Sequence, residues 1–154
     1  MNRKTIFGIS LLLIAVFAIG SVSAIDFGSF LGGEQNQTVT IDGIDFNIPD
    51  GYKEDPNHET VNQTNQKGIV TYITNGKLYE KGNTIVSLLV ADYGDYNVTD
   101  EIAASVGGDA KTLKNVSGYS SQNGQLYVFD YAKNDKLVIL SSNDENAIGE
   151  FVIG

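Results

Sequence analysis

The chain has 154 residues, 19 of them acidic and 10 basic, which gives a formal net charge of -9 at pH 7. A surface this acidic repels phosphate backbones and anionic lipid headgroups, so the charge argues against nucleic acid as a partner. The absence of cysteine excludes disulfides, thiolate catalysis and cysteine-ligated metals, and a hydrophobic content of 42% is typical of a folded domain.

The first 24 residues have the pattern of an export signal. Basic residues open it, an apolar run follows over residues 6–19, and Val22 and Ala24 occupy positions -3 and -1 of a cleavage site. The alternative is an uncleaved anchor, because residues 5–25 are uncharged and about 20 such residues span a bilayer. Both alternatives predict an extracytoplasmic location, either secreted or tethered to the outer face of the membrane.

Residues 25–37 are rich in glycine and are predicted to form a tether, followed by a single domain over residues 38–154. The domain opens with two stretches that alternate apolar and polar residues, 38–41 and 44–48. Asp42-Gly43 lies between them and is a strong signal for a two-residue hairpin turn.

The middle of the chain predicts a loop, a second hairpin and a central strand. Residues 53–67 are polar without periodicity, which indicates a surface loop. Residues 69–74 and 77–80 flank Asn75-Gly76, another hairpin signal. Residues 84–93 are apolar on both faces, which is typical of a strand that is covered on both sides.

Two short helices are predicted. Thr99 is the expected N-cap of the first, with acidic residues in the first turn, where their charge suits the helix dipole, and Gly107-Gly108 ends it. Asn143 is the expected N-cap of the second helix, near the C-terminus. Further strands are predicted over residues 109–113, 116–121, 125–132 and 136–142.

Together these elements predict an α+β fold. We expect a mostly antiparallel sheet of six to eight strands joined by tight turns, with the two helices packed on one face. No internal repeat is evident, and strands do not alternate with helices as they do in parallel sheets.

An acidic, tyrosine-rich corner over residues 92–101 is the densest group of candidate functional residues. Carboxylate and amide oxygens are the ligands that Ca²⁺ prefers, although the spacing differs from that of an EF-hand loop. Tyrosines beside the acids are candidates for contact with a sugar or protein, with core packing as the alternative. The candidates are Asp92, Asp95 and Asn97 for a cation, and Tyr93 and Tyr96 for a ligand.

Four Asn-x-Ser/Thr sequons are present, and they accept glycans only where the host has the machinery. Several sequons also arise by chance in a chain rich in Asn and Thr. If they are used, we expect their asparagines in exposed loops or at element ends: Asn36, Asn62, Asn97 and Asn115.

No catalytic constellation is recognisable. His58 is the single histidine, and no nucleophile motif accompanies it. We therefore predict a non-enzymatic domain, without a cofactor, that binds a protein or glycan at the cell surface. One alternative is a Ca²⁺-dependent binding module built on residues 92–101. Another is a cell-wall hydrolase that uses Asp92 and Asp95.

Residues 44–52, which read Ile-Asp-Phe-Asn-Ile-Pro-Asp-Gly-Tyr, resemble the strand and turn that open PsbP-like domains. The order of elements over residues 84–108, and the terminal strands and helix, are similar to the same group. The chain is also similar to small exported proteins of methanogenic archaea. The resemblance covers residues 38–154. It implies an antiparallel sheet with flanking helices, an adaptor or accessory role, and no shared catalytic residues.

Overall fold

The computed structural model describes residues 37–154. The predicted export signal, most of the predicted tether and Asn36 therefore lie outside the described residues. Neither helix in the described part of the chain has the length and hydropathy needed to cross a membrane.

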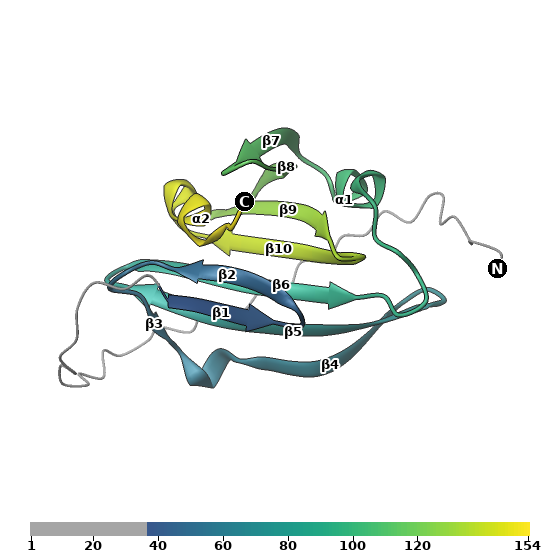
Figure 1. Ribbon diagram of the computed structural model, residues 1–154, viewed down its shortest axis with the longest axis horizontal. Coiled ribbons are helices and arrows are strands. Elements are labelled where there is room, and N and C mark those ends of the chain that lie inside the picture. The colour runs from purple at the N-terminus through teal and green to yellow at the C-terminus, as the bar shows by residue number, and fades with distance from the viewer. Residues whose placement is uncertain (1–36) are drawn as a thin grey trace.

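Eight antiparallel strands form the main sheet (Figure 1). They are β3 (Lys53–Glu54), β4 (Thr60–Lys67), β5 (Val70–Lys81), β6 (Thr84–Asp92), β7 (Asp109–Leu113), β8 (Val116–Asn123), β9 (Leu126–Lys133) and β10 (Lys136–Ser142). The order is β3-β5-β6-β10-β9-β8-β7, and β4 continues the β3 side by pairing with β5. The prediction of an antiparallel α+β fold is confirmed at this level, with the sheet at the upper end of the predicted strand number.

A separate hairpin and a helix cover one face of the sheet. The hairpin consists of β1 (Gln37–Ile41) and β2 (Ile44–Ile48), and the helix is α2 (Glu145–Phe151). Asp42 and Gly43 have φ angles of 48° and 78°, as the predicted two-residue turn requires. Phe46 and Phe151 are fully buried in this first core, together with residues of β6, β9 and β10.

The other helix, α1 (Asp100–Val106), lies on the opposite face of the sheet. Its Ala103 is buried in a second core that includes Leu89 and Ala91 of β6. The expectation that both helices pack on one face is therefore wrong. The physical reason is that β6 and β10 are apolar on both sides, so each face of the sheet needs its own cover.

The prediction of a central strand at residues 84–93 is confirmed. β6 pairs with β5 on one side and β10 on the other. Its alternate residues enter different cores, with Val86, Leu88 and Val90 in the first and Leu89 and Ala91 in the second.

The predicted hairpin turn at Asn75-Gly76 is wrong, because β5 runs without interruption through both residues. Gly76 is needed for a different reason. A Cβ atom at this position would lie 2.6 Å from the carbonyl oxygen of Leu88, so the glycine permits close approach of β5 to β6. The turn between β4 and β5 instead contains Gly68, at a φ of 61°.

The predicted loop over residues 53–67 is also wrong. It contains β3, a 3₁₀ turn η1 (Pro56–His58) and β4. Side chains of β4 are largely exposed on both faces, so no apolar periodicity marks the strand in the sequence. β4 forms because its backbone groups pair with the edge of β5.

The caps of the two helices differ in how well they were predicted. Thr99 is the N-cap of α1, as predicted. Asp144, rather than Asn143, is the N-cap of α2, and its carboxylate accepts a hydrogen bond from Asn146 N at 3.0 Å. Asn143 instead accepts a hydrogen bond from the Ile85 backbone N–H at 2.9 Å. Both residue types cap helices well, so their order alone did not distinguish them.

Candidate functional site

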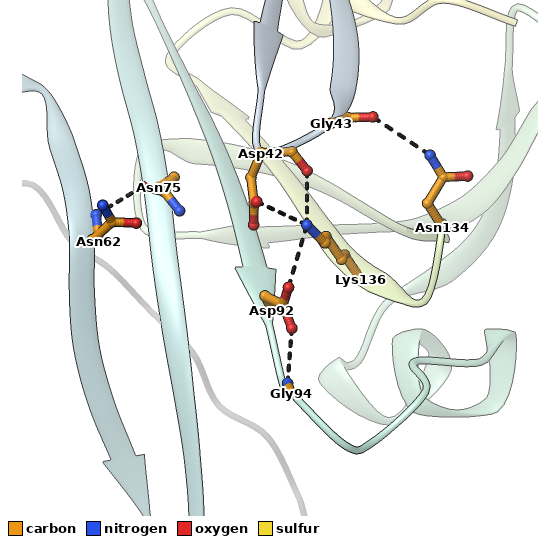
Figure 2. A network of polar contacts seen from close by, with 8 residues as sticks. All are labelled: Asp42, Gly43, Asn62, Asn75, Asp92, Gly94, Asn134 and Lys136. Carbon is orange, nitrogen blue, oxygen red and sulfur yellow. Dashed lines mark hydrogen bonds and ion pairs between the residues drawn. The ribbon is translucent and has the colours of Figure 1, made fainter.

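Asp92, the first candidate cation ligand, is already engaged by a cationic side chain. Lys136 Nζ lies 3.2 Å from its Oδ2 and 2.8 Å from Asp42 Oδ1. The other carboxylate oxygen of Asp92 accepts a hydrogen bond from Gly94 N at 2.7 Å (Figure 2). Lys136 thus supplies the positive charge that a metal ion would bring to this carboxylate.

The other two candidate ligands, Asp95 and Asn97, are exposed in the segment between β6 and α1. Among residues 37–154, no group of three or more His, Asp or Glu side chains is arranged to hold a metal ion. The calcium hypothesis stays a prediction, and it now has to account for competition by Lys136. Asp92 and Asp95 likewise gain no support as a hydrolytic pair.

The two candidate ligand-contact tyrosines pack against the domain. Tyr93 is buried and stacks on Tyr72, with ring centroids 5.0 Å apart and an interplanar angle of 29°. Burial raises the pKa of the Tyr93 hydroxyl above its usual range. Tyr96 is half-buried and packs against the second core. For Tyr93 the structure therefore supports core packing over exposure to a ligand.

Three of the four sequon asparagines lie in the described residues, and all three are exposed. Asn97 precedes α1, and Asn115 lies in the turn between β7 and β8 at a φ of 68°. These two positions match the prediction. Asn62 does not, because it lies within β4, at an irregularity in the pairing with β5.

The strongest candidate for an interaction surface is the ribbon formed by β4, its turn and the start of β5. We call residues 60–73 the β4–β5 ribbon. Among the described residues, it holds all the strongly exposed large hydrophobic side chains: Val61 is 62% exposed, Ile69 90% and Ile73 41%. Lys67 is the single charged residue of these 14 positions in a chain of net charge -9. Val61 and Ile69 lie toward opposite ends of β4, with Ile73 between them on β5, so exposed apolar positions run along the length of the ribbon. Exposed apolar surface of this kind indicates a binding surface.

The outer edge of this ribbon is available for pairing. Among the described strands, β4 pairs with β5 alone, and its register is regular from Gln63 to Lys67. Figure 1 shows it along the margin of the sheet. Near its start, the Asn62 backbone N–H donates to Asn75 Oδ1 at 2.7 Å, which fixes the irregular segment (Figure 2). Such an edge presents main-chain donors and acceptors to another strand.

The edge at the opposite end of the sheet is different. β7 has five residues, and two of them, Asp109 and Lys111, are charged. Lys111 Nζ also forms an ion pair of 2.7 Å with Glu145 Oε1 of α2. Short length and charge are the devices by which proteins protect sheet edges. β7 carries both, whereas β4 is longer and has a single lysine at its end.

A second surface feature is an open, polar groove of about 430 Å³ beside the start of α2. Half-buried Tyr127 contributes an aromatic ring to it. Asn143, which joins β6 to the α2 region, is already committed through hydrogen bonds to Ile85 N and to the Asn83 carbonyl oxygen. The lining consists of Asn83, Thr84, Tyr127, Asn143, Asp144, Glu145 and Asn146.

Asp130 of β9 is an unusual residue that was not among the candidates predicted from the sequence. Its side chain is 0% exposed, and neither carboxylate oxygen has a hydrogen-bond partner within the described part of the chain. It lies between Tyr119 and Ile139 on the neighbouring strands, on the face that α1 covers. Burial raises its pKa to about 7. The sequence signal was an acid on the face of β9 that also carries Leu126 and Val128.

Comparison of the chain with protein-family models, curated proteins and solved structures gives no match. The resemblance to PsbP-like domains and to small exported methanogen proteins therefore stays a prediction. The functional argument depends on the surface features of this chain alone.

Proposed function

We propose that this protein is an extracytoplasmic, non-enzymatic domain that binds an extended segment of a partner protein along the β4–β5 ribbon. One observation carries the proposal. The strongly exposed large hydrophobic side chains of the described residues, Val61, Ile69 and Ile73, all lie on one ribbon, and its outer strand β4 pairs with β5 alone among the described strands. The export pattern of residues 1–24 supports the extracytoplasmic location.

The mode of binding follows from the chemistry of the edge. A partner strand gains affinity from main-chain hydrogen bonds to β4, and side chains next to the edge provide selectivity. Thr64 and Gln66 are exposed, neutral side chains that accommodate such a strand without burying a charge. Ile73 lies opposite Thr64 across the β4–β5 ladder and adds apolar area beside it.

A non-enzymatic role fits the placement of two acidic groups, Asp130 and Asp92. Asp130, the carboxyl whose pKa is raised by burial, is fully buried beneath α1 and does not line the groove. Asp92 is paired with Lys136. Neither carboxylate is presented to a substrate in the way that general acid-base catalysis requires.

The proposal is tested by site-specific photo-crosslinking of the full chain in its own cells. A photoreactive residue at Thr64 of β4 is expected to capture a protein, and the same residue at Thr112 of β7 is the matched control. Both threonines are exposed on edge strands. Equal labelling at the two positions, or none at Thr64, would contradict the proposal.

A glycan ligand in the groove beside α2 is a second candidate function. The observation in its favour is the combination of Tyr127 with amide and carboxylate side chains, since sugars stack on aromatic rings and bond to planar polar groups. Saturation-transfer NMR with surface oligosaccharides tests it. Tyr127→Ala should abolish the transfer if this groove is the site, and Tyr96→Ala should leave the transfer unchanged.

A further inference from the structure

Resting on the proposed use of the β4–β5 ribbon, we infer that the occupant of the β4 edge is a second copy of the same chain. The two β4 strands pair antiparallel across a two-fold axis and join two sheets into one. Every pairing within the described sheet is already antiparallel, so the new pair repeats its geometry. A two-fold interface needs one patch that complements itself.

Charge is the first argument for a second copy. Two molecules that each carry a net charge of -9 repel one another over most of their surfaces. The β4–β5 ribbon contains no acid, so its edge is where two copies meet with little repulsion. The nearest acid before β4, Glu59, pairs with Lys77 at 3.2 Å, and the same Lys77 Nζ lies 2.6 Å from Glu54. The single charge of Lys77 offsets part of the negative charge of these two glutamates beside the edge.

The arrangement of apolar side chains is the second argument. Val61 lies near the start of β4, and Ile69 lies just beyond its end. In an antiparallel pair, the start of one strand faces the end of the other. Val61 of each copy therefore approaches Ile69 of its partner copy, at both ends of the pair. One interface thus covers Val61 and Ile69 of both copies.

The neutral side chains between these ends suit self-pairing. Gln63, Thr64 and Gln66 are exposed and uncharged, so no like charges oppose one another across the axis. The alternative edge, β7, lacks this property because its Asp109 and the neighbouring ion pair of Lys111 with Glu145 bring charges to the contact.

A single engineered cysteine tests the contact directly, because the chain has no cysteine of its own. Asn65→Cys lies at the middle of the regular stretch Gln63–Lys67, where an axis that sets Val61 against Ile69 of the partner copy places the residue opposite its own counterpart. It is expected to form a disulfide-linked dimer about tenfold faster than Thr112→Cys on β7. Non-reducing gel electrophoresis of the folded variants reads out the difference. Equal rates for the two variants would overturn the inference.

Sedimentation of the unmodified chain provides a test that depends on no variant. Between about 10 and 500 µM we expect a reversible, concentration-dependent shift from monomer to dimer. Thr64→Glu should weaken the dimer about tenfold, because it places like charges beside the axis, whereas Thr112→Glu should leave it unchanged. A wild-type chain that sediments as a monomer at every concentration overturns the inference.

The two proposals fail in distinguishable ways. If wild type is monomeric but a photoreactive residue at Thr64 captures a different protein, the second copy is excluded and the ribbon remains a binding surface. If the wild-type dimer is unaffected by Thr64→Glu, the copies meet elsewhere and the inference is overturned. If sedimentation shows only monomer and Thr64 captures nothing, both proposals fail.

Discussion

Lys136 pairs with Asp92 within the main sheet and, through Asp42, joins that sheet to the hairpin that covers it. Lys136 Nζ, at the start of β10, lies 3.2 Å from Asp92 at the end of β6 and 2.8 Å from Asp42 in the hairpin turn. It also donates to the Asp42 backbone carbonyl at 2.8 Å (Figure 2). Partial burial lowers the pKa of Lys136, but its hydrogen bonds to Asp42 and Asp92 outweigh that effect and raise it. The lysine is therefore charged at neutral pH, where both carboxylates can pair with it.

The first prediction concerns this contact. Lys136→Met should lower the free energy of unfolding by about 1–2 kcal/mol, since it removes a partly shielded ion pair and leaves two carboxylates near each other. Urea denaturation monitored by circular dichroism measures the change. Lys111→Met is the control, because its partner Glu145 is half exposed and the pair should contribute less than about 0.5 kcal/mol. Equal losses for both variants would contradict the prediction.

The second prediction tests the calcium hypothesis on the same residues. Removing the ammonium group frees Asp42 and Asp92, whose carboxylates are the kind of ligand that Ca²⁺ prefers. In calorimetry, Lys136→Met should therefore bind Ca²⁺ more tightly than wild type. Wild-type binding that is as tight as that of the variant would show that Lys136 does not compete, and would support a site at Asp95 and Asn97 instead.

The third prediction concerns pH and Asp130. Burial raises the pKa of this carboxyl from about 3.8 to about 7, so the folded state holds a proton that the unfolded chain releases. The contribution of Asp130 to the free energy of unfolding is fully present below about pH 4 and is lost as the pH rises toward 7. The total loss in the free energy of unfolding is about 4 kcal/mol.

Asp130→Asn should remove this dependence, because an amide does not titrate in that range. The measurement is the free energy of unfolding of wild type and variant at several values between pH 4.5 and 7.5. The difference between the two proteins isolates the contribution of Asp130 from that of every group the two proteins share. Asp109→Asn, at an exposed acid, serves as the control. Parallel stability curves for Asp130→Asn and wild type would contradict the prediction.

The outcome at two turn signals shows what the sequence could and could not determine. Asp42-Gly43 and Asn75-Gly76 carry the same hairpin signal, and only the first is a turn. β1 and β2 form a separate two-stranded sheet, so no pairing with a further strand opposes the preference of Asp42-Gly43 for a turn. At the second, pairing of β5 with both β4 and β6 outweighs the local preference. The ladder partners of these two residues, Thr60, Leu89 and Val90, lie well outside a two-residue turn signal, so that signal alone does not predict the pairing.

The candidate surfaces show the same limit. The apolar faces of β6 were predictable because burial leaves a pattern in the sequence. The β4 edge was not predictable, because this strand is exposed on both sides, is polar apart from Val61 and has the composition of a loop. Asp92 was recognised as a candidate, but its partner Lys136 lies 44 positions later, and only the β6–β10 pairing brings them together.

The fourth prediction concerns Gly76, and its control variant should change the free energy of unfolding in the opposite direction. Gly76→Ala would place its Cβ atom 2.6 Å from the Leu88 carbonyl oxygen, so β5 and β6 must separate. The expected loss is about 1–3 kcal/mol in the free energy of unfolding.

At Gly149 of α2, the nearest atom to an added Cβ is 3.9 Å away, on Leu113. Gly149→Ala should therefore stabilise the protein by up to about 1 kcal/mol through its higher helix propensity. Thermal unfolding of the two variants beside wild type gives shifts in opposite directions. If Gly76→Ala were neutral, Asn75-Gly76 would be behaving as a flexible turn, and the uninterrupted β5 strand would be wrong.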